Sequence, residues 1–145
     1  MGPDLRVCVL GAVADPEAAR LGRLLDVPTL SSVRALLGRR PRVVLVRGPL
    51  EAMGRPALGA TLAGVAAVVY LPVGPPAPLP WWGRRFHRLL FASQEEARAW
   101  NAAGVALGRL VVVEPSGDAL ERRALAAMIE EVASMAGRRA MAGAR

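Results

Sequence analysis

Residues 42–47 read RVVLVR, and this run decides the fold class of the chain. Its four central residues are all apolar, so it lacks the alternation of polar and apolar residues that marks a half-exposed strand. Strands without alternation are buried on both faces, as in a parallel sheet that helices cover on both sides. Residues 66–71 and 110–113 have the same character. We therefore predict an α/β protein built around a parallel sheet.

Helix signals separate these strands. Asp15, Pro16 and Glu17 combine a capping acid, a proline in the first helical position and an acid in the first turn. Residues 93–96 read SQEE, which is a capping box, and residues 118–121 carry its acidic version. Gly38 is expected to end a helix over residues 31–37 in the left-handed conformation.

This alternation of strands and helices predicts one domain over residues 1–145, with a single open, mainly parallel, Rossmann-like sheet and helices on both faces. The longest helix is expected at residues 119–138, where an apolar stripe that includes Leu120, Leu125 and Ile129 needs a partner surface. We expect this helix to pack back on the sheet of its own chain. The alternative is that it pairs with a second copy in a homodimer.

The composition excludes several classes of protein. Of the 145 residues, 53% are hydrophobic, so the chain is not a disordered tail. The formal net charge is +7, and all 19 basic residues are arginines. The single cysteine, Cys8, and the single histidine, His87, exclude a disulfide framework and a metal site of several cysteines or histidines. We expect Cys8 to be a small core residue and no metal to be bound.

The motifs of common nucleotide-binding and hydrolytic sites are missing. Residues 11–20, the loop after the first strand, lack GxGxxG, and the chain has neither a P-loop nor a GxSxG elbow. Arg47 stands where a phospho-acceptor receiver domain would need an aspartate. We therefore predict no nicotinamide or other resident cofactor.

Ligands of open α/β sheets bind beyond the carboxyl ends of the strands. Arg47 leads the candidates there, because a guanidinium can hold a carboxylate or phosphate through two parallel hydrogen bonds. The alternative is a solvated arginine that covers a helix end. Ser93 and Glu114 have alternatives to ligand binding as well: Ser93 caps a helix as part of its capping box, and Glu114 pairs with a nearby arginine. The ligand-binding candidates are Gly11, Arg47, Gly48, Ser93 and Glu114.

Residues 81–88 read WWGRRFHR, the densest aromatic and basic cluster in the chain. Tryptophans favour the membrane interface and arginines favour anionic headgroups, so the cluster predicts a membrane-binding or anion-binding surface. The alternative is a helix whose tryptophans pack on the sheet while its arginines face water. The candidates for this surface are Trp81, Trp82, Arg84, Arg85, His87 and Arg88.

The expected location is the cytoplasm, with residues 81–88 as a route to peripheral attachment at the membrane. We expect no signal peptide in residues 1–11, because they contain Asp4 and too short an apolar run, and the apolar run 57–71 is shorter than the roughly 20 residues of a spanning helix. No RRM, KH or helix-turn-helix signature is present, so we expect no specific nucleic-acid partner.

Residues 90–118 read LFASQEEARAWNAAGVALGRLVVVEPSGD, a strand, a serine, a helix, a glycine and a strand that runs into a "pxGvD"-like turn. Residues 42–53, RVVLVRGPLEAM, look like a "pDvVhvHgpl" strand and loop, and residues 66–73 fall at the place of a "pvvvtvHd" strand. Together these stretches resemble the N-terminal domain of GT-B glycosyltransferases of the retaining, family 4 type. The resemblance covers most of residues 5–118.

The resemblance implies that this chain corresponds to the acceptor-binding half of a two-domain GT-B enzyme. The family's two histidines are missing, with Arg47 at the first place and Leu71 and Pro72 in the region of the second, and the glycine-rich loop is reduced to Gly11. The donor-binding domain with its paired glutamates has no counterpart in these residues. We therefore expect a glycosyltransferase-like domain that is inactive alone, either degenerate or completed by a partner chain that supplies donor binding.

Two other functions stay open. A non-catalytic module would use residues 81–88 to dock on an anionic membrane or an acidic partner. A small independent enzyme at the strand ends would need a nucleophile, a base and an orienting group together, and the sequence offers no such set.

Overall fold

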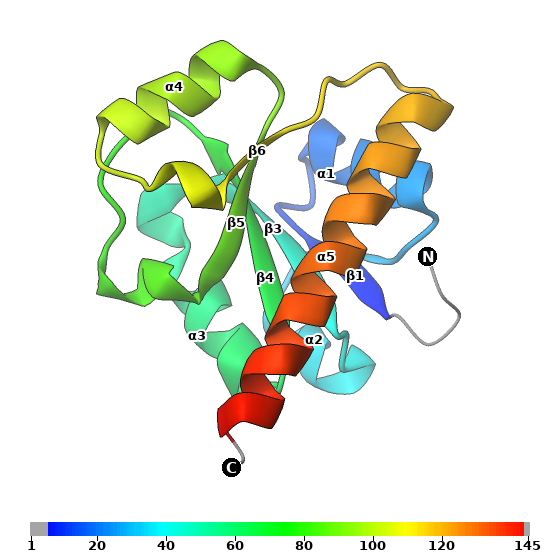
Figure 1. Cartoon of the computed structure of the whole chain (residues 1–145). Coiled ribbons are helices and arrows are strands. Elements are labelled where there is room, and N and C mark those ends of the chain that lie inside the picture. Colours follow the sequence, from blue (N-terminus) through cyan, green and yellow to red (C-terminus); the bar gives the residue numbers. More distant parts are fainter. Residues whose placement is uncertain (1–5, 144–145) are drawn as a thin grey trace.

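Six parallel strands form one open sheet within residues 6–143, the part of the chain that the computed structural model describes; side chains are described for residues 6–138 (Figure 1). Every neighbouring pair of strands is parallel. The predicted fold class, α/β with an open parallel sheet, is therefore confirmed. In spatial order the strands are β2 (Thr29–Leu30), β1 (Val7–Leu10), β3 (Val43–Pro49), β4 (Ala67–Val73), β5 (Phe86–Phe91) and β6 (Leu110–Val112).

Helices connect these strands and cover both faces of the sheet (Figure 1). The α-helices in the described part are α1 (Pro16–Leu25), α2 (Arg34–Arg39), α3 (Gly54–Leu62), α4 (Gln94–Ala102) and α5 (Ala119–Gly143). Three short 3-10 helices accompany them: η1 (Leu50–Ala52), η2 (Trp81–Arg85) and η3 (Leu107–Arg109).

The unalternated run of β3 is divided between two hydrophobic cores. Val43 and Leu45 pack with residues of α1 and α5, whereas Val44 and Val46 pack with residues of α2, α3 and α4. None of these four side chains is exposed to solvent. Successive residues of a strand point to opposite faces, so a strand between two helical layers needs apolar residues at every position.

The long helix α5 lies on the same face of the sheet as α1 (Figure 1). Leu125, Met128, Ile129 and Val132 are buried in this core. Leu120 was expected in the same stripe, but its side chain is 70% exposed. In the first turn of α5 it is Glu121 that points inward, and Leu120 therefore points away from the sheet.

Two local expectations are wrong. Gly38 lies inside α2, and the left-handed residue after this helix is Arg40, with a φ of 46° and its N–H bonded to the carbonyl of Leu36. The helix begins later than expected, at Arg34, and its end moves accordingly. Residues 81–88 do not form one helix, because η2 gives way to β5 at Phe86.

None of the helices in the described part of the chain combines the length and apolar character needed to cross a bilayer.

Candidate functional site

A crevice opens at the carboxyl edge of the sheet between β1 and β3. The chain leaves β1 towards α1 on one face of the sheet, and it leaves β3 towards α3 on the other face. Such a change of face is a topological switch point, where ligands of doubly wound sheets bind. The strand order from β2 to β5 is the flavodoxin-like one, which has its switch point at this same pair of strands.

A cavity of about 530 Å³ lies at this point, and we call it the switch-point cavity. Small-molecule sites typically fall in the range of about 300–1,000 Å³. Apolar side chains such as Leu10, Val46 and Met53 form much of its wall. Asp15 and Arg47 are the charged residues among those that line it. A mostly apolar wall with one charged pair suits a ligand that has an apolar body and one charged group.

Asp15 holds the guanidinium of Arg47 in place. The Nε–H of Arg47 donates to Oδ2 of Asp15 at 2.7 Å, while Oδ1 of Asp15 accepts from the backbone N–H of Glu17 at 3.0 Å and caps α1. Both side chains are partly buried, with exposed fractions of 23% for Arg47 and 16% for Asp15. The two terminal nitrogens of Arg47 donate no hydrogen bond to the described residues. These nitrogens are the donors that an anionic ligand would use.

Close packing explains the two candidate glycines of the crevice. A Cβ atom at Gly11 would lie 2.8 Å from the Cβ of Ala18, and one at Gly48 would lie 2.6 Å from the Cε of Met53. Gly11 therefore allows α1 to approach the end of β1. The carbonyl of Gly48 accepts a hydrogen bond of 2.8 Å from the buried hydroxyl of Tyr70, and burial raises the pKa of that hydroxyl above its ordinary value. Tyr70 is thus a fixed, neutral support of the crevice.

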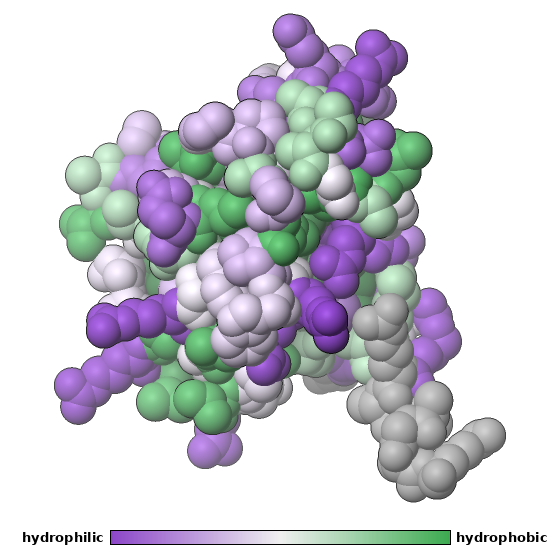
Figure 2. Space-filling view, turned by 90° about the vertical axis from the view of Figure 1, so that its left-hand side faces the viewer, coloured by the Kyte–Doolittle hydropathy of each residue, from purple (hydrophilic) through white to green (hydrophobic). Residues whose placement is uncertain are grey.

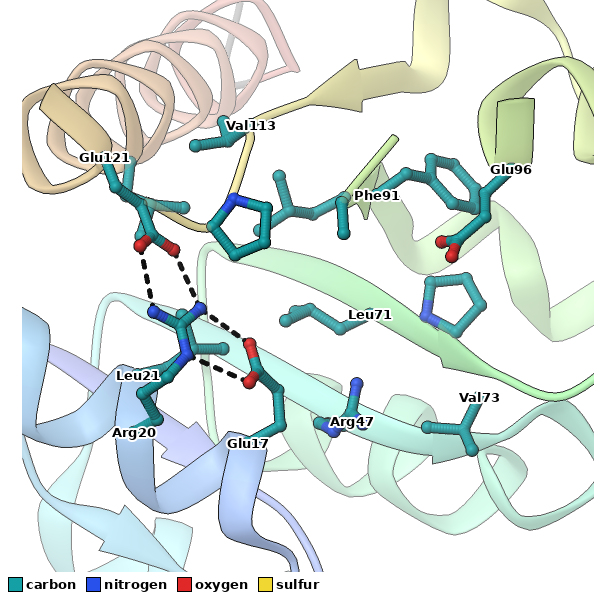
Figure 3. Close-up of a pocket in the computed structure, with 15 residues that line it drawn as sticks. Glu17, Arg20, Leu21, Arg47, Leu71, Val73, Phe91, Glu96, Val113 and Glu121 are labelled. Atoms are coloured by element: carbon teal, nitrogen blue, oxygen red, sulfur yellow. Dashed lines mark hydrogen bonds and ion pairs between the residues drawn. The ribbon is translucent and has the colours of Figure 1, made fainter. Parts of the chain in front are cut away.

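A second cavity, of about 310 Å³, lies on the opposite face of the sheet between α1 and α5 (Figure 3). We call it the α1–α5 cavity. It shares Arg47 and Val73 with the switch-point cavity, so Arg47 stands between the two. Glu96 lies across this cavity from Glu121 (Figure 3).

Arg20 joins two carboxylates in the wall of the α1–α5 cavity (Figure 3). Its Nη1 and Nη2 atoms donate to Glu121 at 2.9 and 2.8 Å, and its Nε and Nη2 atoms donate to Glu17 at 2.9 and 2.7 Å. Hydrogen bonds from Arg20 hold the pKa of Glu121 below its ordinary value, although burial acts in the opposite direction. The same bonds, first to Glu17 and then to Glu121, raise the pKa of Arg20. The network ties α1 to the start of α5.

The charged residues that line the two cavities are arginines, aspartate and glutamates. Among the described residues, neither cavity is lined by a histidine or a cysteine. No group of three or more metal-ligating side chains gathers anywhere in the described part of the chain. Arg47 is the residue best placed to meet a ligand, because Arg20 is already engaged by two carboxylates.

The other two strand-end candidates lie apart from Arg47. Ser93 is the N-cap of α4, and its Oγ accepts from the backbone N–H of Glu96 at 3.3 Å, as the capping box predicts. Ser93 lines a further cavity, of about 480 Å³, with Gly74 and Trp100. Glu114 follows β6, is exposed, and lines neither of the two cavities.

The six candidates of the aromatic and basic cluster differ in exposure and in the elements that they contact. Trp82 is half-buried and packs edge to face on the ring of Phe86, with the two ring centroids 5.9 Å apart. Arg88 points towards α5, where its guanidinium lies 3.7 Å from Glu131. Trp81 and Arg84 are exposed, whereas Arg85 is half-buried.

His87 is the extra residue of an irregularity in the pairing of β4 and β5. Val68 pairs with Phe86 and Val69 pairs with Arg88, so His87 has no place in the ladder. Its Nδ1 accepts from the backbone N–H of Val68 at 3.2 Å. The imidazole of His87 therefore accepts a hydrogen bond from the backbone of β4 at the position where the pairing of β4 and β5 is irregular.

Several residues of the site were missed from the sequence. Asp15 and Glu121 were interpreted only as helix-capping acids, and each has a second bond to an arginine of another segment. Glu17 was recognised only as a first-turn acid, and Arg20 not at all. The local capping signals were correct, but they gave no indication of partners that lie far along the chain.

Comparison with protein-family models, with curated proteins and with solved structures finds no match for this chain.

Proposed function

We propose that residues 6–143 form a non-catalytic ligand-binding domain of the acceptor-side, glycosyltransferase-like kind. Its ligand has an apolar body and an anionic group, and it occupies the switch-point cavity with the anionic group on Arg47. The observation that carries this proposal is the Asp15–Arg47 pair at the switch point, where one nitrogen of the guanidinium is fixed and the other two bond to none of the described residues.

The charge distribution around Arg47 supports an anionic ligand. Asp15 accepts from Nε of Arg47 and from the N-terminus of α1, so both of its oxygens are engaged. A carboxylate or phosphate that meets the terminal nitrogens would also lie near the start of α1, where the helix dipole favours negative charge. Asp15 therefore positions Arg47 and does not compete for its outer nitrogens.

Sugar transfer is not part of this proposal. The two cavities lack a histidine among their described lining residues. The described part of the chain forms one sheet and includes no second domain that would bind a nucleotide sugar. Transfer would require a donor-binding unit from a partner chain or from elsewhere in a longer protein. The glycosyltransferase-like origin is proposed from the sequence resemblance alone.

Thermal denaturation with benzyl phosphate and its neutral analogue benzyl alcohol tests the proposal. A ligand that binds only the folded state raises its apparent stability. We expect benzyl phosphate to raise the melting temperature in a concentration-dependent manner and benzyl alcohol to have a much smaller effect. Arg47→Gln should weaken benzyl phosphate binding about tenfold or more, which corresponds to the roughly 1.4 kcal/mol of a charge-assisted bond.

Two matched variants serve as controls. Arg23→Gln removes an exposed arginine from α1, and Glu96→Gln removes a carboxylate that lines only the α1–α5 cavity of the two. Both should bind benzyl phosphate as the unchanged chain does. Equal binding by Arg47→Gln, or no binding of benzyl phosphate by the unchanged chain, would contradict the proposal.

A further inference from the structure

A face of the molecule whose residues do not line the switch-point cavity combines an exposed tryptophan with arginines. η2 lies at its centre, with α3 on one side and η3 on the other. Trp81, the first residue of η2, is 69% exposed. Figure 2 shows this side of the molecule, where hydrophilic side chains project around paler and hydrophobic ones. We call it the η2 face and define it by Arg55, Leu62, Trp81, Arg84, Leu107 and Arg109.

The backbone that carries Trp81 is firmly held. Arg109 of η3 donates to the carbonyl of Gly83 at 3.2 Å, and the Nη1 atom of Arg85 donates to Oγ1 of Thr61 on α3 at 2.8 Å. Gly83 is buried against Leu79. Trp82, beside Trp81, is half-buried and packs against the core next to Phe86. The exposed indole therefore extends from a rigid base and is not part of a loose loop.

The η2 face carries positive charge without acidic residues in its own segments. No aspartate or glutamate stands between Glu51 and Glu95, or between Glu96 and Glu114. These two stretches contain all of α3, η2 and η3. Arg55 and Arg84 are exposed on them.

The two elements next to η2 each carry an exposed leucine. Leu62, at the end of α3, is 85% exposed, and Leu107, at the start of η3, is 73% exposed. A surface that only neutralises phosphates, as on a nucleic acid, has no use for exposed leucines. A membrane interface accepts apolar side chains and tryptophan while its anionic headgroups bind arginines.

We propose that the η2 face docks on a bilayer that contains anionic lipids. Trp81 enters the interfacial region, Leu62 and Leu107 contact its edge, and the arginines lie among the lipid phosphates. This inference is independent of the proposed ligand site, because none of the six residues lines the switch-point cavity.

Vesicle co-sedimentation of the full chain tests the docking. The vesicles contain phosphatidylglycerol and phosphatidylcholine in equal amounts, or phosphatidylcholine alone. We expect binding to the anionic vesicles only, and binding that weakens as salt is raised. The emission of Trp81 should shift to the blue on binding, and Trp81→Ala should abolish that shift, because Trp100 is buried and Trp82 is half-buried.

Matched variants separate this face from general positive charge. Arg55→Gln combined with Arg84→Gln should weaken vesicle binding about thirtyfold, whereas Arg23→Gln combined with Arg122→Gln, which removes two exposed arginines on α1 and α5, should change it less than threefold. Trp81→Ala should weaken binding at least tenfold, and Leu120→Ala, at another exposed apolar residue, should not. All of these side chains are exposed, so unchanged melting temperatures will verify folding.

Three results would overturn the proposal. The first is no binding to the anionic vesicles. The second is an equal loss of binding in the two double-arginine variants. The third is a stronger, Trp81-dependent binding to a duplex oligonucleotide than to the anionic vesicles, which would assign the face to nucleic acid.

Discussion

At the scale of single residues, Glu121 is a buried carboxylate whose protonation depends on Arg20. Its side chain is 2% exposed, and two nitrogens of Arg20 bond to it. Its pKa in the folded chain lies below the ordinary value of 4.5, so the folded state resists its protonation more than the unfolded chain does. The stabilisation that this causes is present above the unfolded pKa and is lost as the pH falls through the folded pKa.

We therefore expect the free energy of unfolding to fall as the pH decreases below 4.5, with Glu121 as one cause. Glu121→Gln should cost about 2 kcal/mol at pH 7, because Arg20 loses a charged partner. In the same variant the loss of stability at acidic pH should be smaller. Urea denaturation at pH 7 and at several pH values below 4.5 measures both effects. Glu114→Gln, at an exposed position, is the control, and an unchanged acid dependence in Glu121→Gln would contradict the prediction.

Gly11 offers a second test at this scale. A Cβ atom there would meet Ala18 of α1 at 2.8 Å, whereas one at Gly108 would meet nothing within 4 Å. Gly11→Ala should therefore lower the free energy of unfolding by about 1–3 kcal/mol through overpacking, and Gly108→Ala should have an effect near zero. Denaturant titration of both variants decides the point. Equal stability would show that α1 can move away from β1 at little cost.

At the scale of secondary structure, α5 contributes a large part of one hydrophobic core. Ile129 has no exposed surface, so Ile129→Ala should lower the free energy of unfolding by about 2–5 kcal/mol. Leu120→Ala, in the same helix at a side chain that is 70% exposed, should change it by less than about 0.5 kcal/mol. Thermal and urea denaturation measure both. Truncation after Asp118 should abolish cooperative unfolding, and a truncated chain as heat-stable as the full chain would show that α5 is dispensable.

At the scale of the whole molecule, the isolated chain should transfer no sugar. The described residues around the two cavities bring together no nucleophile, base and orienting group, and they include no donor-binding unit. Release of nucleotide from a nucleotide sugar, with and without benzyl alcohol as an acceptor, should therefore equal the blank. Release above the blank that disappears in Arg47→Gln would contradict this expectation.

Local patterns in the sequence predicted most of the elements and left the site incomplete. The apolar run 43–46 and the caps at Asp15 and Ser93 depend on neighbouring residues, so they were visible in the sequence. The bond of Asp15 to Arg47 and that of Arg20 to Glu121 depend on how the strands are ordered and where α5 returns, which no local pattern specifies. For residues 81–88, a change in strand register decides which side chains point inward.

The position of Cys8 has a further consequence for following the motions of this protein. It is the single thiol of the chain, it is 3% exposed in β1, and burial raises its pKa despite the nearby charge of Arg39. A thiol reagent can therefore react only when the native structure opens around Cys8, either because β1 separates from the sheet or because α2 and α3 move away from this side chain. The rate of that reaction measures how often the native state opens around Cys8. No cysteine has to be introduced for the measurement. Because β1 borders the switch-point cavity, saturating benzyl phosphate should slow the reaction of Cys8 with the thiol reagent, and it should not do so in Arg47→Gln.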